Sequence, residues 1–277
     1  MAIDLNRTTM QLPAELSDEI LGAAVKGSAV MQLARQVALP GSGKSIPVIT
    51  SDSTAAWTDE TNEKQVSNPA LGVKTMKPYK LACIELFSEE LLRDMPALYD
   101  ELVRRAPAAI AKTFDATVLH GSAPGTGFDT LADAAIITNE DAYAAYLDAM
   151  STIGAAGGQM DGVAISAQGK AQLFKVMGNG APVFVDPATG SVAGVLGARL
   201  ADTQEAAAAG AVATAGDWSL ARFGIVDGIR ISVSRDATVT TGGEDINLWQ
   251  RNMVGIRIEA ELGFIVANKA AFARIGE

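Results

Sequence analysis

The chain is poor in the residues on which most metal proteins and many enzymes depend. Its 277 residues include one cysteine, Cys83, and one histidine, His120. A lone cysteine cannot form a disulfide within the chain, and one cysteine with one histidine cannot hold zinc without carboxylate ligands. A nucleophilic pair of the Ser–His or Cys–His kind would have to use His120. We therefore expect no metal, no cofactor and no enzymatic activity.

Positive charge is scarce as well. The 22 Lys and Arg residues against 32 Asp and Glu residues give a formal net charge of −10. This balance repels nucleic acid at long range and argues against sequence-specific binding of DNA or RNA. The first 20 residues lack the apolar run of a secretory signal, and no stretch reaches the roughly 18 apolar residues of a membrane span. We expect a soluble protein, made in the cytosol, with no membrane partner.

What the chain does contain is enough apolar sequence for a large core. Hydrophobic residues make up 48% of the composition and charged residues 19%, which is ordinary for a folded protein. At this length the chain can form one large domain or two modest ones.

One stretch, "LPGSGKSIPV" at residues 39–48, looks like part of a nucleotide-binding loop. A phosphate loop needs a glycine five positions before Gly43-Lys44-Ser45 and a helix after it, but the chain has Ala38 at that position. The following "IPVIT" is β-branched, and its proline disfavours helix at Ile46. The stretch therefore predicts a turn that leads into a strand, and a nucleotide hydrolase using Lys44 remains a remote alternative.

Residues 44–87 predict an extended excursion. Two long strands, "KSIPVIT" and "TMKPYKLACIELF", flank the polar stretch "TDETNEKQVSNPALG". Its apolar side chains, among them Trp57 and Val66, are too few to form a core, so the excursion must lie on another surface. We expect Trp57 to act as an anchor between subunits, in contrast to Trp218 and Trp249, for which core packing is the simpler expectation.

Helical patterns flank and follow this excursion. Residues 12–39 predict a short helix within an otherwise extended arm, with Leu16, Ile20, Ala23 and Ala24 on one side and Ser17 as a possible N-cap. A long helix is predicted from Pro96 to Leu119, with a bend at Pro107. Its apolar pattern consists of Leu98, Leu102, Ala106, Ala109, Thr113, Val118 and Gly121. His120 at its end is typical of a cation near the negative end of a helix dipole.

The rest of the chain predicts a mixed region and two closing strands. Helices are expected at 139–153 and 167–177 around the strand "GVAIS", and the Ala- and Gly-rich run 205–216 is expected to be a loop. Asp227-Gly228 predicts a hairpin turn. The alternation in "VGIRIEAELGFIV", residues 254–266, predicts a long strand with one buried face.

No catalytic constellation emerges from these elements. Cys83 lies in a strand-like segment, where a structural thiol is the simpler interpretation. The acidic pairs Asp59-Glu60, Glu89-Glu90 and Glu244-Asp245 are neighbours in sequence, and adjacent side chains of an extended chain point apart.

The order of these segments resembles the major capsid protein of tailed double-stranded DNA phages, with the Hong Kong 97 type of α+β shell fold. The resemblance is carried by "AAWTDE", "YKLACIELFSEELLRD", "AIAKTFDATVLHG", "VLGARL", "GDWS" and "AAFARI". It implies an N-terminal arm at 1–43 and an extended loop at 44–80. It further implies a peripheral domain with a long spine helix at 81–122 and 241–277, and an axial domain at 123–240.

The resemblance also implies a function. Copies of the chain would assemble into hexamers and pentamers of an icosahedral shell around double-stranded DNA, bound without sequence specificity, in the virion. Portal protein and separate scaffold or decoration proteins would be further partners. A nanocompartment shell of the same fold, holding cargo protein, is the alternative. We expect contacts between subunits at Trp57, Glu60, Lys64, Lys74 and Lys77. Some relatives crosslink a loop lysine to an asparagine, but no residue set here, Asn247 and Asn252 included, identifies such a pair.

Overall fold

A computed structural model describes residues 22–51, 54–60, 62–67, 70–90, 96–178, 181–185, 190–192 and 194–276. The predicted helix at residues 12–39 falls partly outside this range. Within it, residues 22–27 are helical and the short helix α2 spans Ala29–Leu33. The arm is thus more helical, between residues 22 and 33, than the sequence indicated.

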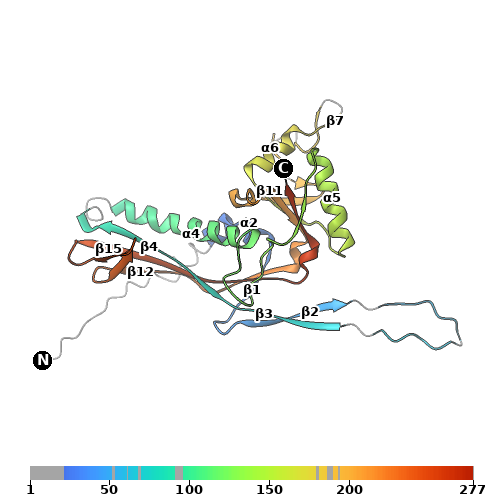
Figure 1. Ribbon diagram of the computed structural model, residues 1–277, viewed down its shortest axis with the longest axis horizontal. Helices are drawn as coiled ribbons and strands as arrows, with labels where there is room; N and C mark the ends of the chain where they lie inside the picture. Colours follow the sequence, from blue (N-terminus) through green and yellow to red (C-terminus); the bar gives the residue numbers. More distant parts are fainter. Residues whose placement is uncertain are drawn as a thin grey trace.

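The first of two main sheets has four strands in the order β1-β12-β15-β4. Its strands are β1 (Arg35–Ala38), β12 (Ala221–Ser234), β15 (Met253–Val266) and β4 (Tyr79–Ser88). β1 runs parallel to β12, whereas the other neighbours are antiparallel. The helix α4 (Pro96–Leu119) lies along this long, narrow sheet (Figure 1).

The second sheet has six strands in the order β5-β16-β11-β6-β10-β9. These are β5 (Ala135–Ile137), β16 (Phe272–Gly276), β11 (Ala211–Gly216), β6 (Gly162–Ile165), β10 (Ala198–Asp202) and β9 (Gly194–Val195). The helices α5 (Ala142–Ala155) and α6 (Ala167–Lys175) pack on it and form a body at one end of α4 (Figure 1).

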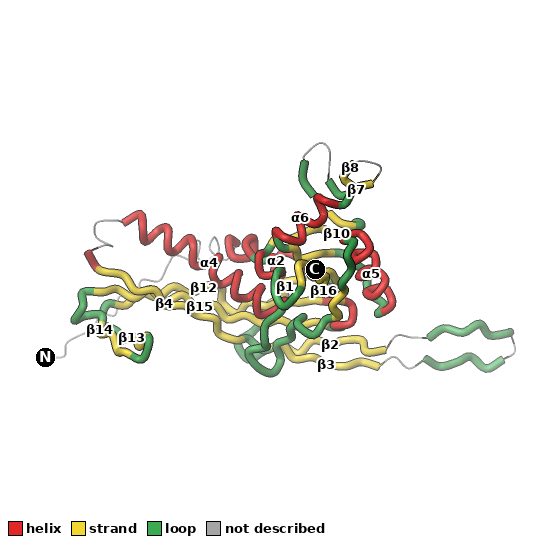
Figure 2. The backbone as a smooth tube through the Cα atoms, turned by 45° about the horizontal axis from the view of Figure 1, so that its top comes forward, coloured by secondary structure: helices red, strands yellow, loops and turns green. Residues whose placement is uncertain are grey.

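Smaller elements project from these two bodies. The hairpin of β2 (Lys44–Ser51) and β3 (Ala70–Met76) extends away from both sheets (Figure 2). Two shorter pairs are β13 (Thr238–Thr241) with β14 (Glu244–Asn247), and β7 (Met177–Gly178) with β8 (Ala181–Pro182). Single 3-10 turns stand at η1 (Gln204–Ala206), η2 (Trp218–Leu220) and η3 (Lys269–Ala271).

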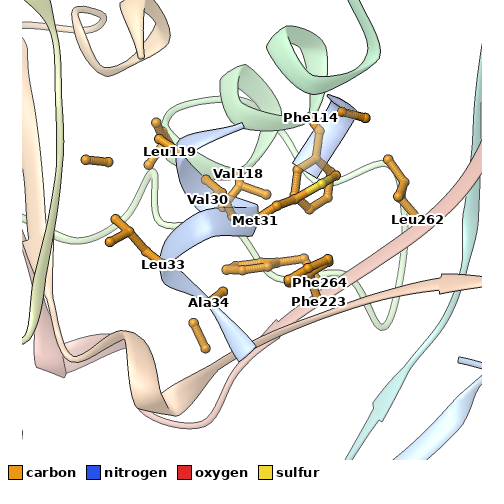
Figure 3. Close-up of a cluster of buried hydrophobic side chains, with 14 of the residues drawn as sticks. Val30, Met31, Leu33, Ala34, Phe114, Val118, Leu119, Phe223, Leu262 and Phe264 are labelled. Carbon is orange, nitrogen blue, oxygen red and sulfur yellow. The ribbon is translucent and has the colours of Figure 1, made fainter. Parts of the chain in front are cut away.

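One hydrophobic core joins the arm, the helix α4 and the first sheet. Val30 and Met31 of α2 lie among Phe114 of α4, Phe223 of β12 and Phe264 of β15 (Figure 3). The rings of Phe114 and Phe264 meet edge to face at 6.2 Å, an arrangement that aromatic pairs favour. The arm is therefore part of the folded body from α2 onward.

Several elements confirm the sequence predictions. The long helix begins at Pro96 and ends at Leu119, as expected. The helix α5, the strand β6 and the helix α6 match the predicted segments within a few residues. In β15, alternate residues from Val254 to Val266 are buried, which confirms the expected dry face. The α+β class is confirmed as well.

The buried face of α4 was predicted only in part. Val118 is buried as expected, but Ala109 and Thr113 are exposed, whereas Ile110 and Phe114, which the expected pattern left out, are buried against the first sheet. The sequence "AAIAKTFDATV" offers alanine on several sides, so spacing alone could not fix the rotation of the helix. The large side chains, Ile110 and Phe114, decide it because they bury the most apolar area.

Three other predictions were wrong in detail. Residues 211–216 form the fully buried strand β11 rather than a loop. Asp227-Gly228 is a bulge inside β12, where the register with β15 shifts between Ile225 and Ile229, and not a hairpin turn. The returning strand of the excursion breaks after Met76, and β4, from Tyr79, belongs to the first sheet.

Strand pairing joins segments that are far apart in the sequence. β12, in the range 123–240, pairs with β15 and β1 in the first sheet. β16, in the range 241–277, pairs with β11 and β5 in the second sheet.

Candidate assembly surfaces

The Gly43-Lys44-Ser45 stretch is a tight turn that enters β2. Gly43 has φ of +88°, and its N–H donates a hydrogen bond of 2.9 Å to the carbonyl of Pro40. A Cβ at Gly43 would lie 2.8 Å from the Met76 carbonyl oxygen, so the turn requires glycine. Lys44 donates to the carbonyl of Ala38 at 3.3 Å. Because a strand follows where a phosphate loop needs a helix, nucleotide hydrolysis is not supported.

The other residues considered for chemistry have structural surroundings. Cys83 is half-buried in β4, and burial, with Glu85 nearby, raises the pKa of its thiol, which keeps it protonated. His120 directly follows α4, with its Nε2 atom 3.9 Å from an oxygen of Glu205. Within the described ranges, no three His, Cys, Asp or Glu residues are grouped as a metal site requires. No helix in the same ranges is long and apolar enough to cross a membrane.

The tip of the β2–β3 hairpin is exposed throughout its described residues, apart from Ser67, which is half-buried. Trp57 lies there fully exposed, and Val66 at the tip and Val73 on β3 are also exposed. Large apolar side chains grouped on one projecting element indicate a contact surface. Glu60 and Lys64 lie on the same tip, and both are exposed.

The three tryptophans differ sharply in burial. Trp218 is fully buried, and its indole N–H donates a hydrogen bond of 3.0 Å to the carbonyl of Gly162. Its ring meets Phe272 edge to face at 5.4 Å. Trp249 was expected in the core but is 72% exposed, just before β15. That expectation was wrong because the strand-like sequence around Trp249 forms a turn between β14 and β15.

The base of the hairpin is tied to the body by Lys74. Its ammonium group lies 3.2 Å from Asp129 Oδ2 and donates a hydrogen bond of 2.6 Å to the carbonyl of Val266. Lys269 lies 3.7 Å from the other oxygen of Asp129. Lys74, one of the expected contact residues, thus bonds within its own chain, whereas Lys77 beside it is exposed. Contacts of Trp57, Glu60, Lys64, Lys74 and Lys77 with a neighbour stay a prediction.

The root of the N-terminal arm is held by Asp115, a residue that the sequence analysis did not single out. This carboxylate is fully buried on α4 and accepts hydrogen bonds from Ser28 Oγ at 2.5 Å, Ala29 N at 2.8 Å and Val30 N at 3.3 Å. Burial raises the pKa of Asp115, and the hydrogen bonds lower it only in part. The one available signal was an acidic residue on the apolar side of a helix.

These features define a class of protein. The described part of the chain carries a long projecting hairpin with exposed apolar side chains, and it holds no grouped metal ligands. Such a molecule is suited to assembly with other chains.

Comparisons with known proteins agree with that class. The model of the phage capsid family matches residues 9–276, and the chain belongs to this family. It is 27% identical over 283 residues to the "Probable major capsid protein gp17" of Mycobacterium phage D29, covering 95% of this chain and 89% of the relative. The protein of the same title from Mycobacterium phage L5 is also 27% identical, over 295 residues.

Solved structures share the fold. A chain from Mycobacterium phage Adephagia superposes with a TM-score of 0.74 at 23% identity, with 90% of each chain covered. A chain from Gordonia phage Cozz gives a TM-score of 0.72 at 22% identity, covering 90% of this chain and 86% of that one. A neighbour titled "Capsid of native GTA particle computed with C5 symmetry" gives 0.65 at 16% identity. Family and fold support the function of a major capsid protein, a structural role, over a nanocompartment shell or an enzyme.

Proposed function

We propose that many copies of this chain assemble into hexamers and pentamers, which form an icosahedral shell around a double-stranded DNA genome. The observation that carries this proposal is the projecting β2–β3 hairpin with Trp57 fully exposed at its tip. A fully exposed indole on an element without its own core gains most from burial against another molecule. A structural neighbour titled "Capsid of native GTA particle computed with C5 symmetry" supports assembly into a capsid.

The mechanism of assembly is mechanical. Each hairpin reaches beyond its own body and overlaps an adjacent copy, with Trp57, Glu60, Lys64 and Lys77 at or near the contact. Each such contact is modest, because binding must offset the loss of rotational and translational freedom. In a closed particle every copy makes similar contacts in its hexamer or pentamer, so the modest contacts add up over the shell.

The domain organisation that the resemblance implies can be assigned to the two sheets. The arm at 1–43 and the extended loop at 44–80 keep their expected ranges. The peripheral domain would comprise 81–122 and 241–277, and the axial domain 123–240. The sheet pairing supports two adjustments, with β12 counted as peripheral and β16 as axial.

Further partners follow from the same proposal. A portal protein would occupy one vertex, and separate scaffold or decoration proteins could join the shell, which would reside in the virion after synthesis in the host cytoplasm. DNA would be enclosed without sequence-specific contacts. The net charge of −10 agrees with this, because DNA affinity depends on cationic groups that neutralise phosphates.

Electron microscopy of the purified protein tests the proposal. We expect closed shells, or hexameric and pentameric capsomers, in the wild type, and nuclease-protected DNA in native particles. Trp57→Ala should reduce assembly while leaving the far-ultraviolet circular dichroism of the subunit unchanged. Trp249→Ala, at a second exposed tryptophan away from the hairpin, is the matched control. A wild-type protein that stays a monodisperse monomer under all assembly conditions would contradict the proposal.

A further inference from the structure

The two ends of the β2–β3 hairpin carry opposite charge. At the tip, Asp59, Glu60 and Glu63 are exposed within five residues of one another, with Lys64 as the one neighbouring cation in the described part of the tip. Trp57 lies two residues before this acidic group. The tip is therefore a projecting acidic surface with an exposed indole at its edge.

The base of the same hairpin is cationic and hollow. A cavity of about 440 Å³ lies there, lined by Lys74, Thr75, Lys77, Thr126, Gly127, Asp129 and Ile265. Lys269 approaches it through its contact with Asp129. Two ammonium groups, those of Lys74 and Lys269, thus lie 3.2 and 3.7 Å from the Asp129 carboxylate, and Lys77 is a third cation on the lining. We call this cavity the basal cleft.

The framework of the basal cleft is held in place by hydrogen bonds. Asp129 Oδ2 accepts from the Val266 N–H at 3.0 Å and from Lys74, which also donates to the Val266 carbonyl. The N–H of Lys77 donates to the Gly127 carbonyl at 3.0 Å. The Lys77 side chain is exposed, and it makes no ion pair with the part of the chain that the structure describes. A preorganised cleft with one exposed cation is suited to an incoming carboxylate.

A hairpin cannot fill its own cleft. The tip and the base lie at opposite ends of the two paired strands, and Figures 1 and 2 show the hairpin extending straight away from the body. The occupant of matching charge must therefore come from another molecule. A second copy of this chain carries that acidic tip.

We propose that the acidic tip of one copy docks in the basal cleft of the next copy, so that the hairpins run head to tail around a capsomer. This inference rests on the proposed function and adds the site, the polarity and the charge pairing of the contact. Lys77 is the principal cation for Asp59, Glu60 and Glu63, and Lys74 and Lys269 add a positive field. Trp57 reaches the neighbour's surface beside the cleft.

The length of the hairpin agrees with this arrangement. From Lys44 to Glu60 the chain runs 16 residues, which is about 50 Å at roughly 3.3 Å per residue. Six hairpins laid end to end form a hexagon whose radius equals its side, again about 50 Å. A head-to-tail contact of this kind closes into a ring when the rotation per copy divides a full turn.

Charge reversal tests the pairing. The variants Lys77→Glu and Glu60→Lys/Glu63→Lys should each raise the concentration needed for assembly by about tenfold or more, because like charges then meet in the contact. The combination of both should restore assembly to within about threefold of wild type. The mismatched combination of Lys77→Glu with Asp236→Lys, an exposed acid outside the hairpin, should restore nothing.

Mixing the cleft variant Lys77→Glu with the tip variant Glu60→Lys/Glu63→Lys gives a sharper readout. In a head-to-tail ring, Lys77→Glu subunits accept only reversed tips, so the two chains must alternate. Alternation closes a ring of six but not a ring of five. At a concentration just sufficient for wild-type assembly, we expect neither variant to assemble alone and the mixture to form hexamers without pentamers, as measured by native mass spectrometry.

A crosslink tests the geometry even if charge reversal impairs folding. In a Cys83→Ser background, Glu60→Cys with Lys77→Cys should give disulfide-linked ladders that end at closed hexamers and pentamers upon oxidation of assembled particles. Asp236→Cys with Lys77→Cys is the control and should give none. If shells form normally but the ladder is absent, or if matched and mismatched reversals behave alike, the head-to-tail pairing is wrong while the shell function stands.

Discussion

In the six-stranded sheet and in the β2–β3 hairpin, local strand preference and burial are related in opposite ways. Strand β11 reads "AVATAG", with weak strand preference, yet all six of its residues are buried. The hairpin has β-branched strands, "KSIPVITS" and "ALGVKTM", yet exposes Val73 and the tip beyond it. In the sheet, close packing of small residues stabilises the strand. In the hairpin the strands are locally favourable, and only the base is buried within the chain, where Ile46 and Met76 pack with Leu39 and Ile265.

The two tryptophans of these regions provide the strongest test of that contrast. Trp218→Ala should lower the free energy of unfolding by about 3–5 kcal/mol, since it removes a fully buried ring and its hydrogen bond to Gly162. Trp57→Ala should change the stability of the unassembled subunit by less than about 0.5 kcal/mol. Denaturant unfolding of the dissociated subunit measures both. Equal losses would show that Trp57 packs on its own chain.

The next largest difference in stability is expected between a variant that weakens the attachment of the arm and one that weakens the attachment of the hairpin. Asp115→Ala would leave three buried donors of α2 without an acceptor, and we expect a loss of about 3 kcal/mol. Lys74→Ala removes a partly exposed ion pair and one hydrogen bond, for a loss of about 1 kcal/mol. Thermal unfolding of the two variants beside wild type checks the order. A larger effect from Lys74 would mean that the hairpin base is part of the core.

The attachment of the arm through Asp115 should also make stability depend on pH. The pKa of Asp115 is raised in the folded state, so its contribution is fully present below the unfolded value near 3.8 and is lost as pH rises through the folded pKa. The free energy of unfolding of wild type should therefore fall relative to that of Asp115→Asn over this window. Asp133→Asn, at an exposed position, serves as the control. Parallel pH profiles for wild type and Asp115→Asn would contradict the burial of an ionised carboxylate.

The smallest effect is expected at Lys44, in the turn that enters the hairpin. Lys44→Ala should alter stability by less than about 0.5 kcal/mol, because its hydrogen bond to Ala38 is long and exposed. Isothermal titration should detect no ATP binding at millimolar concentration in either wild type or variant. Binding that disappears in Lys44→Ala would instead revive the nucleotide hypothesis.

The elements predicted best are those in which the local sequence pattern indicates the same structure as the packing in the folded chain. The helix from Pro96 to Leu119 has clear end signals, and β15 has a strict alternation. The order of segments was enough to indicate the capsid fold. The exposure of Trp57, Glu60 and Lys64 on a projecting loop also agrees with the sequence interpretation.

The errors arose where tertiary contacts override local signals. Gly228 has φ of +77°, which suits a hairpin turn and a bulge equally, and only the pairing with β15 distinguishes them. The Ala-rich residues 211–216 become a strand because β6 and β16 flank them. Asp115 and Asp129 bind groups about 86 and 137 residues away, a separation that no local pattern reveals.

The positions of β15 and β16 have a consequence for biosynthesis. β15 lies between β12 and β4, and β16 lies between β5 and β11, so both sheets are complete only when residues 253–276 are in place. While a ribosome is still translating that stretch, the hairpin has already emerged but neither body can close around its core. Assembly-competent subunits therefore arise only after residues 253–276 have been made, and folding dominated by such distant pairings is expected to be slow.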